Sequence, residues 1–173
     1  MSVLEKFKSI RTFVFDVDGV MTDGSVQVTD AGEQWRTMNT KDGYSLQLAV
    51  KKGYRILVIS GGQSEGVRLR LKGLGIEDVF LHVKDKIGVL KEYMKEHDLG
   101  LDDMLYMGDD IPDYGVMKQV GLACAPADAA PEIRHIAAYI SSFNGGHGCV
   151  RDVIEKVLKL NGHWELDISI ASK

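Results

Sequence analysis

Cysteine and proline are scarce in this chain of 173 residues, and basic residues are outnumbered by acidic ones, 21 to 25. Its two cysteines are too few for a disulfide framework and lack the spacing of a zinc site, so we expect a reducing, cytoplasmic compartment. The net charge of −4, without a long basic stripe, argues against nucleic acid as a partner. No apolar run reaches transmembrane length and residues 1–9 alternate in charge, so we expect neither a membrane span nor a signal peptide.

Short apolar runs alternate with amphipathic segments along the whole chain. Strand-like runs occupy residues 12–16, 56–60, 79–83, 104–108 and 122–125, and helices are expected at residues 43–52, 64–74, 86–97, 114–120 and 149–160. This alternation predicts an α/β fold with a doubly wound, Rossmann-like parallel sheet. Because 45% of the residues are hydrophobic, the chain can form a substantial core, and we expect one domain over residues 1–173.

Four of these runs end at or shortly before residues with distinctive chemistry. In chain order these are the segment Asp16-Val17-Asp18-Gly19, Ser60, Lys86 and the segment Gly108-Asp109-Asp110. In an open parallel sheet, ligands bind at the carboxyl ends of the strands. We therefore expect the four segments to converge on one site.

The residue types suit hydrolysis of a phosphate monoester. Such an ester is an anion, so a carboxylate attacks it only where a cation offsets the developing charge. We expect Asp16 to be the nucleophile that forms an aspartyl-phosphate, and Asp18 to protonate the leaving oxygen and later deprotonate water. Ser60 and Lys86 would hold the phosphoryl oxygens.

An oxygen-only ligand set favours Mg²⁺ as the cofactor, and Mn²⁺ would also fit. We expect the ligands to be Asp16, Asp109 and the backbone carbonyl of Asp18. Asp110 and Asp113 are expected to surround the metal without binding it directly.

Each segment also has a structural interpretation. An Asp-x-Asp-Gly run can begin a calcium-binding EF-hand, but the fifth, sixth and twelfth positions of that loop are here Val20, Met21 and Gln27, which do not fit. Ser60 alone could cap a helix, Lys86 alone could be solvated, and Gly-Asp-Asp alone could form a turn. Their order along the chain favours the catalytic interpretation.

The ordered set resembles the motifs of the haloacid dehalogenase superfamily of phosphohydrolases. Within it, residues 18–24, 39–44 and 145–152 resemble the family that hydrolyses 3-deoxy-D-manno-octulosonate 8-phosphate, a step of lipopolysaccharide biosynthesis, and the likeness covers nearly the whole chain. The resemblance implies a keto sugar acid phosphate as substrate. It also implies substrate contacts at Asn39, Thr40, Lys41, Asp42, Gly43, Arg70 and Lys86.

The chain departs from the pattern of that family at three positions. Gly62 and Gln47 stand where many members have Arg, and His147 replaces the Arg of their Gly-Gly-Arg-Gly stretch. A nonulosonate 9-phosphate of the sialic acid type therefore remains an alternative substrate. Lys41 and Arg70 could also be plain surface charges.

The spacing leaves no room for the cap domain that related phosphatases insert, so we expect a capless fold. Residues 24–38 instead read as a projecting β-hairpin with a turn at residues 30–32. The resemblance implies a homotetramer in which hairpins associate and a neighbouring subunit helps to close each site. The alternative is a hairpin folded on its own domain. For the apolar tail, residues 162–173, the resemblance implies a reach into a neighbour's site, and the alternative is a strand or arm packed on its own surface.

Two other classes of protein share parts of this pattern. A response-regulator receiver carries its acid pair on the first strand and its phosphoacceptor on the third, an order that this chain does not follow. A noncatalytic tetramerisation module of a sugar-nucleotide synthetase should lack catalytic carboxylates. This chain retains Asp16, Asp18, Lys86 and Asp109, which favours an enzyme.

Overall fold

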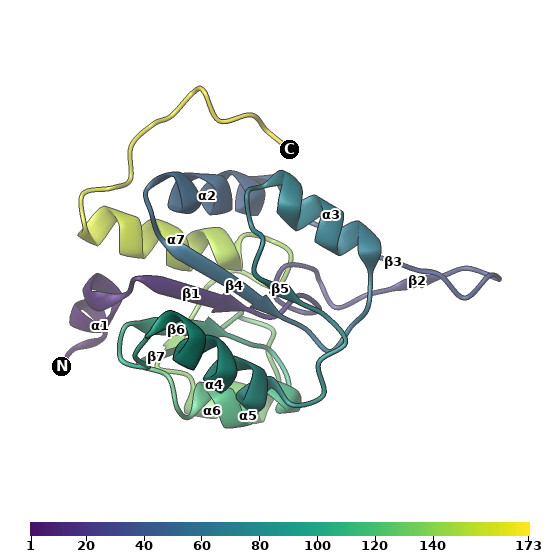
Figure 1. The fold of residues 1–173 in the computed structure, drawn as a ribbon, viewed down its shortest axis with the longest axis horizontal. Helices are drawn as coiled ribbons and strands as arrows, with labels where there is room; N and C mark the ends of the chain where they lie inside the picture. The colour runs from purple at the N-terminus through teal and green to yellow at the C-terminus, as the bar shows by residue number, and fades with distance from the viewer.

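The computed structural model describes residues 1–173 and contains a six-stranded parallel sheet with helices on both faces (Figure 1). Its strands are β1 (Thr12–Phe15), β4 (Arg55–Ile59), β5 (Val79–Phe80), β6 (Met104–Met107), β7 (Leu122–Ala125) and β8 (Tyr139–Ile140), in the order β5-β4-β1-β6-β7-β8. All residues of β1, β6 and β7 are buried, as expected of strands covered on both faces. The predicted α/β fold is confirmed.

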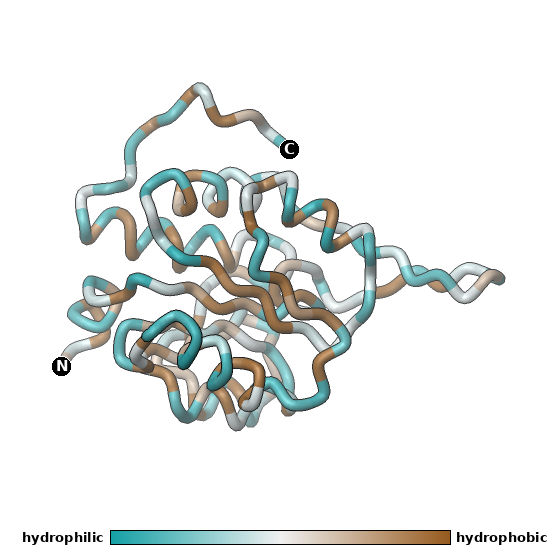
Figure 2. Tube along the Cα trace, viewed as in Figure 1, coloured by the Kyte–Doolittle hydropathy of each residue, from teal (hydrophilic) through white to brown (hydrophobic).

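Alternation along the strands divides the core into two layers. In β1, Phe13 and Phe15 belong to one apolar cluster and Val14 to the other, because successive side chains of a strand point to opposite faces. The first layer is covered by α1 (Val3–Ser9), α2 (Thr40–Lys51), α3 (Glu65–Gly73) and α7 (Cys149–Leu160). The second is covered by α4 (Lys86–His97), α5 (Tyr114–Met117) and α6 (Pro131–Ile136). Figure 2 shows the hydrophobic residues concentrated along the strands between these layers.

Several elements differ from the sequence-based prediction. The elements α1, α6, β8 and the 3₁₀ turn η1 (Ile111–Asp113) were not expected, since each is short and gives little periodic signal. Helix α2 begins three residues earlier than predicted because Asn39 caps it, accepting hydrogen bonds from the amides of Lys41 and Asp42. Helix α5 and strand β5 are shorter than predicted. No helix is long and apolar enough to span a membrane.

The hairpin leaves the body of the molecule (Figure 1). It consists of β2 (Gln27–Val28) paired antiparallel with β3 (Gln34–Trp35), and all four residues are exposed. No cap domain follows the first motif or lies between β4 and α4, so the capless prediction is confirmed.

The tail beyond α7 contains neither helix nor strand and runs across α2 (Figure 1). The hydroxyl of Tyr44 accepts a hydrogen bond from the amide of Asp167 at 3.1 Å, and Lys52 pairs with Glu165 at 2.8 Å. Trp164 and Ile170 pack against the core cluster of that face. In this single chain the tail is therefore an arm on its own surface and not a strand.

Candidate active site

The structure brings the four motif segments together at the carboxyl ends of three strands. Asp16 directly follows β1, Ser60 follows β4, Asp109 follows β6 after one glycine, and Lys86 begins α4. All four line one pocket of about 540 Å³, together with Asp18. We call this the catalytic pocket.

Acidic groups crowd one side of the catalytic pocket. Carboxylate oxygens of Asp16, Asp109 and Asp113 lie within 4.8 Å of one another. Burial, followed by the charge of neighbouring carboxylates, raises the pKa of Asp16 to about 6 and the pKa of Asp109 to about 7. These carboxylates repel one another when they are charged, and a divalent cation between them would offset the repulsion. Their oxygen atoms are the hard ligands that Mg²⁺ or Mn²⁺ prefers.

Lys86 sits between two of these carboxylates. Its Nζ lies 2.9 Å from Oδ2 of Asp16 and 2.7 Å from Oδ1 of Asp113. Burial lowers the pKa of Lys86, but the two carboxylates outweigh this effect and the pKa is raised, so the side chain remains a cation. The ammonium therefore holds a fixed position beside the proposed nucleophile.

Asp113 organises the loop after β6. Besides Lys86, its carboxylate accepts the hydroxyl of Tyr106 at 2.6 Å and the backbone amide of Asp109 at 3.1 Å. These donors bind both carboxylate oxygens of Asp113 and hold the loop that carries Asp109. Tyr106 was not singled out from the sequence, where it appears only as one member of an apolar run. A hydroxyl within an otherwise aliphatic strand was the available signal.

The tight loop after Asp16 depends on Gly19. This residue has a φ of +83°, and a Cβ built there would lie 1.8 Å from Oδ2 of Asp109. Glycine is therefore required both for the backbone conformation and for the approach of Asp109 to the β1 loop.

Asp18 contacts a residue that the sequence analysis missed. Arg36, which follows β3 at the base of the hairpin, donates from Nε to Oδ1 of Asp18 at 2.7 Å and from Nη2 to Oδ2 at 3.1 Å. Nothing in the local sequence indicated this contact, because it depends on how the hairpin leaves the body of the molecule.

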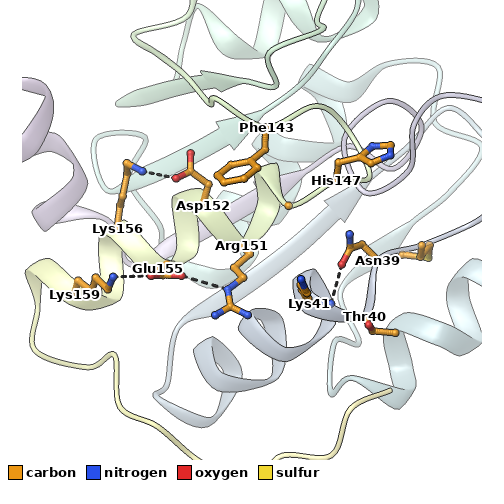
Figure 3. A pocket seen from close by; sticks show the side chains of 12 residues that line it. Asn39, Thr40, Lys41, Phe143, His147, Arg151, Asp152, Glu155, Lys156 and Lys159 are labelled. Atoms are coloured by element: carbon orange, nitrogen blue, oxygen red, sulfur yellow. Dashed lines mark hydrogen bonds and ion pairs between the residues drawn. The ribbon is translucent and has the colours of Figure 1, made fainter.

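The predicted substrate residues fall into separate environments. Thr40 and Lys41 line a groove of about 960 Å³ beside α7, together with Asn39, His147 and Arg151 (Figure 3). Asn39 also donates to the carbonyl of Gly146 at 3.1 Å and thereby joins α2 to the loop before α7.

Arg70 and Gly43 lie away from that groove. Arg70 lines a third pocket, of about 570 Å³, at the hairpin base, and its Nη2 donates to the carbonyl of Lys173 at 2.5 Å. Gly43 lies under this contact, since a Cβ there would meet Arg70 Nη2 at 2.9 Å.

Asp42 differs from the other predicted substrate residues. It is 3% exposed and lines none of the three pockets, and its Oδ1 accepts the backbone amide of Arg151 at 2.9 Å while Oδ2 has no partner. The carboxylate thus provides an acceptor for a backbone amide in the first turn of α7, where the N-cap residue Gly148 has no side chain to do so. Asp42 therefore lies buried at the α2–α7 junction in this structure.

This burial predicts a pH dependence of stability. Burial raises the pKa of Asp42 from 3.8 to about 6 despite the amides of Arg151 and Gly148, so the folded state retains its proton where the unfolded chain has lost it. Stability must therefore fall as the pH rises from about 4 to about 6, by about 3 kcal/mol from this group. Asp42→Asn removes that component while keeping an oxygen acceptor.

Urea unfolding of both proteins at pH 4, 5, 6 and 7 checks this expectation. The stability of Asp42→Asn relative to wild type should increase with pH and reach a plateau above pH 6. Asp102→Asn, in an exposed loop, is the control and should follow wild type throughout. A constant difference between Asp42→Asn and wild type across the series would contradict the prediction.

Comparisons with known proteins agree with this geometry. Residues 72–154 match the haloacid dehalogenase-like hydrolase family. The 3-deoxy-D-manno-octulosonate 8-phosphate phosphatase KdsC of Escherichia coli K12 is 32% identical over 160 residues, which cover 92% of this chain and 85% of that protein.

Solved structures show the same likeness. The phosphatase of that name from Yersinia pestis superposes with a TM-score of 0.90 at 32% identity, covering 93% of this chain and 87% of the other. The enzyme from Moraxella catarrhalis, solved with a magnesium ion, a phosphate ion and 3-deoxy-D-manno-octulosonate (KDO), has a TM-score of 0.88 at 31% identity, covering 91% and 90% of the two chains. The chain therefore belongs to the haloacid dehalogenase-like phosphatases, in the family of the 3-deoxy-D-manno-octulosonate 8-phosphate phosphatases.

Proposed function

We propose that this protein hydrolyses 3-deoxy-D-manno-octulosonate 8-phosphate through an aspartyl-phosphate on Asp16, with Mg²⁺ as cofactor. The observation that carries the proposal is the catalytic pocket itself, where Lys86 pairs with Asp16 while Asp109 and Asp113 complete an acidic cluster. The magnesium-bound and KDO-bound relative from Moraxella catarrhalis supports both the ion and the sugar acid. When bound by Asp16, Asp109 and the Asp18 carbonyl, the ion would neutralise charge on the phosphoryl group.

The residues of the pocket then have separate roles. One oxygen of Asp16 attacks phosphorus, the bond to the sugar oxygen breaks, and Asp18 delivers a proton to that oxygen. Lys86 and Ser60 hold the phosphoryl oxygens through a charge and a hydroxyl, respectively. Asp18 next takes a proton from water, which attacks phosphorus, releases phosphate and restores Asp16.

A nonulosonate 9-phosphate is the second candidate substrate. Gly62 lines the catalytic pocket without a side chain, and Gln47 is occupied by a hydrogen bond to the carbonyl of Ala171 at 3.0 Å. Neither position supplies the arginine that many family members have, so this chain lacks the positive charge that those members carry at each of the two positions.

A homotetramer built around the hairpin is also part of the proposal. Val26, Val28 and Trp35 are 40%, 68% and 59% exposed on a two-stranded ribbon, which is marginally stable alone. Association of hairpins would bury these side chains and would place a neighbour beside each catalytic pocket. The buried, free cysteines Cys124 and Cys149 accord with the cytoplasmic location that we also propose.

Sedimentation equilibrium tests the assembly. We expect a tetramer at micromolar concentration, and Val28→Lys with Trp35→Lys should dissociate it because like charges would meet in the paired hairpins. A wild-type protein that sediments as a monomer at these concentrations would refute the assembly.

Phosphate release with Mg²⁺ across a panel of substrates tests the function. The panel contains the octulosonate 8-phosphate, nonulosonate 9-phosphates and neutral hexose phosphates. We expect the highest kcat/KM for the octulosonate. A clear preference for a nonulosonate would replace the substrate but keep the chemistry, whereas no hydrolysis of any ester would favour the noncatalytic assembly module.

A further inference from the structure

The space that a side chain at position 62 would occupy is taken by the side chains of Asp18 and Arg36. A Cβ at this position would lie 2.8 Å from Oδ2 of Asp18 and 3.0 Å from Nη2 of Arg36. Gly62 does not have a positive φ, so its backbone does not require glycine. Two hydrogen bonds hold the backbone of Gly62 in place. Its amide donates to Oγ of Ser60 at 3.2 Å, and its carbonyl accepts the amide of His82 at 2.9 Å. Space, and not backbone conformation, explains the glycine.

Arg36 uses this space to reach Asp18 in a two-pronged arrangement, with bonds of 2.7 and 3.1 Å. A third nitrogen, Nη1, donates to the carbonyl of Gln34 at 3.1 Å and anchors the guanidinium to the hairpin base. The hydrogen bond with Asp18 raises the pKa of Arg36 further, so the side chain carries its charge at every relevant pH.

Arg36 also lines the 570 Å³ pocket at the hairpin base, which we call the side pocket. The side pocket contains a second arginine, Arg70, and the hydroxyls of Thr40 and Ser64, and no acidic residue lines it. The catalytic pocket, in contrast, is lined by Asp16, Asp18, Asp109 and Asp110. Arg36 thus stands at the boundary between an acidic pocket that takes a phosphate with its metal and a basic pocket suited to a second anion.

We propose that Arg36 is the residue that selects substrates carrying a second acidic group. In the free protein its guanidinium pairs with Asp18, and in the complex it contacts the substrate carboxylate in the side pocket while the phosphate ester occupies the catalytic pocket. Exchanging one carboxylate for another keeps the guanidinium paired and leaves Asp18 free to face the leaving oxygen. A neutral sugar phosphate offers no such exchange. The inference rests on the proposed function and adds the residue that recognises the acid.

Two ligands that differ only in the acidic group test this inference. Gluconate 6-phosphate has a carboxylate where glucitol 6-phosphate has a hydroxymethyl group. Their dissociation constants, measured by calorimetry with Mg²⁺, give the preference for an acid independently of turnover. We expect wild type to prefer gluconate 6-phosphate, and Arg36→Met to weaken its binding by about 10- to 100-fold, as for loss of a charged hydrogen bond, so that the preference disappears. Arg134→Met, an exposed arginine on α6, is the matched control and should behave as wild type.

Gly62→Ala provides an independent variant. Its methyl group would displace the guanidinium, so the preference should fall as in Arg36→Met, whereas Gly73→Ala, whose Cβ would meet nothing within 4 Å, should leave it intact. Equal binding of the two ligands by wild type, or an unchanged preference in both Arg36→Met and Gly62→Ala, would overturn the inference. Failure of wild type to hydrolyse the octulosonate 8-phosphate would refute the proposed substrate, and the binding measurements would still decide the role of Arg36.

Discussion

Asp16→Asn should reduce phosphate release by at least about 10⁴-fold, because an amide oxygen cannot form the acyl phosphate on which the proposed two-step reaction depends. The fold should remain intact. Asp16 is buried next to Lys86 and Asp113, and burial already disfavours its charge, so a neutral side chain of the same size should be tolerated there. Steady-state assays with the octulosonate 8-phosphate and thermal unfolding of the same preparation measure the two effects.

Asp110→Asn is the matched control for this experiment. Asp110 lines the same pocket, and its Oδ1 accepts the amide of Ile111 at 2.8 Å, a bond that an asparagine oxygen can also accept. We expect its activity to stay within about 10-fold of wild type, since it neither attacks phosphorus nor transfers the proton. Turnover by Asp16→Asn at a rate near that of wild type would show that Asp16 is not the nucleophile.

The sequence predicts the parts of this molecule that depend on neighbouring residues. The runs ending near Asp16, Ser60 and Asp109 are locally apolar, and the parallel sheet follows from their alternation with helices. Convergence of their carboxyl ends on one pocket follows from the sheet type alone. The short edge strand β8 gives no such local signal, because it has two residues, of which Tyr139 is half-buried and Ile140 is exposed.

Contacts between distant segments account for what sequence analysis missed. Arg36 meets Asp18 across 18 residues and Asp42 meets Arg151 across 109 residues. Each of these side chains reads locally as a surface charge or as part of a motif. Arg36 reaches Asp18 because of the direction in which the hairpin leaves the body of the molecule. Asp42 reaches Arg151 because α2 packs on α7. Packing places Asp42 at the start of α7.

Removal of the Lys86 charge should have the second large effect. In Lys86→Met, Asp16 and Asp113 lose the ammonium that lies 2.9 and 2.7 Å from them. Breaking a buried ion pair on one side leaves uncompensated charge and typically costs about 3–5 kcal/mol of folding stability. Loss of a cation at the phosphoryl group should lower kcat by about 10²- to 10³-fold. Urea unfolding without metal and kcat measured with Mg²⁺ determine the two quantities.

The double variant Lys86→Met with Asp113→Asn separates stability from catalysis. Neutralising Asp113 removes one of the two unpaired carboxylates, and the single amide oxygen can still accept either the hydroxyl of Tyr106 or the amide of Asp109, which bind different oxygens of the carboxylate. The double variant should therefore recover a substantial part of the lost stability and none of the lost kcat, because no cation returns to the phosphoryl group. Recovery of kcat together with stability would mean that Lys86 acts only by holding the fold. If the double variant lost as much stability as Lys86→Met and Asp113→Asn lose together when each is measured alone, Lys86 and Asp113 would not interact, contrary to the geometry.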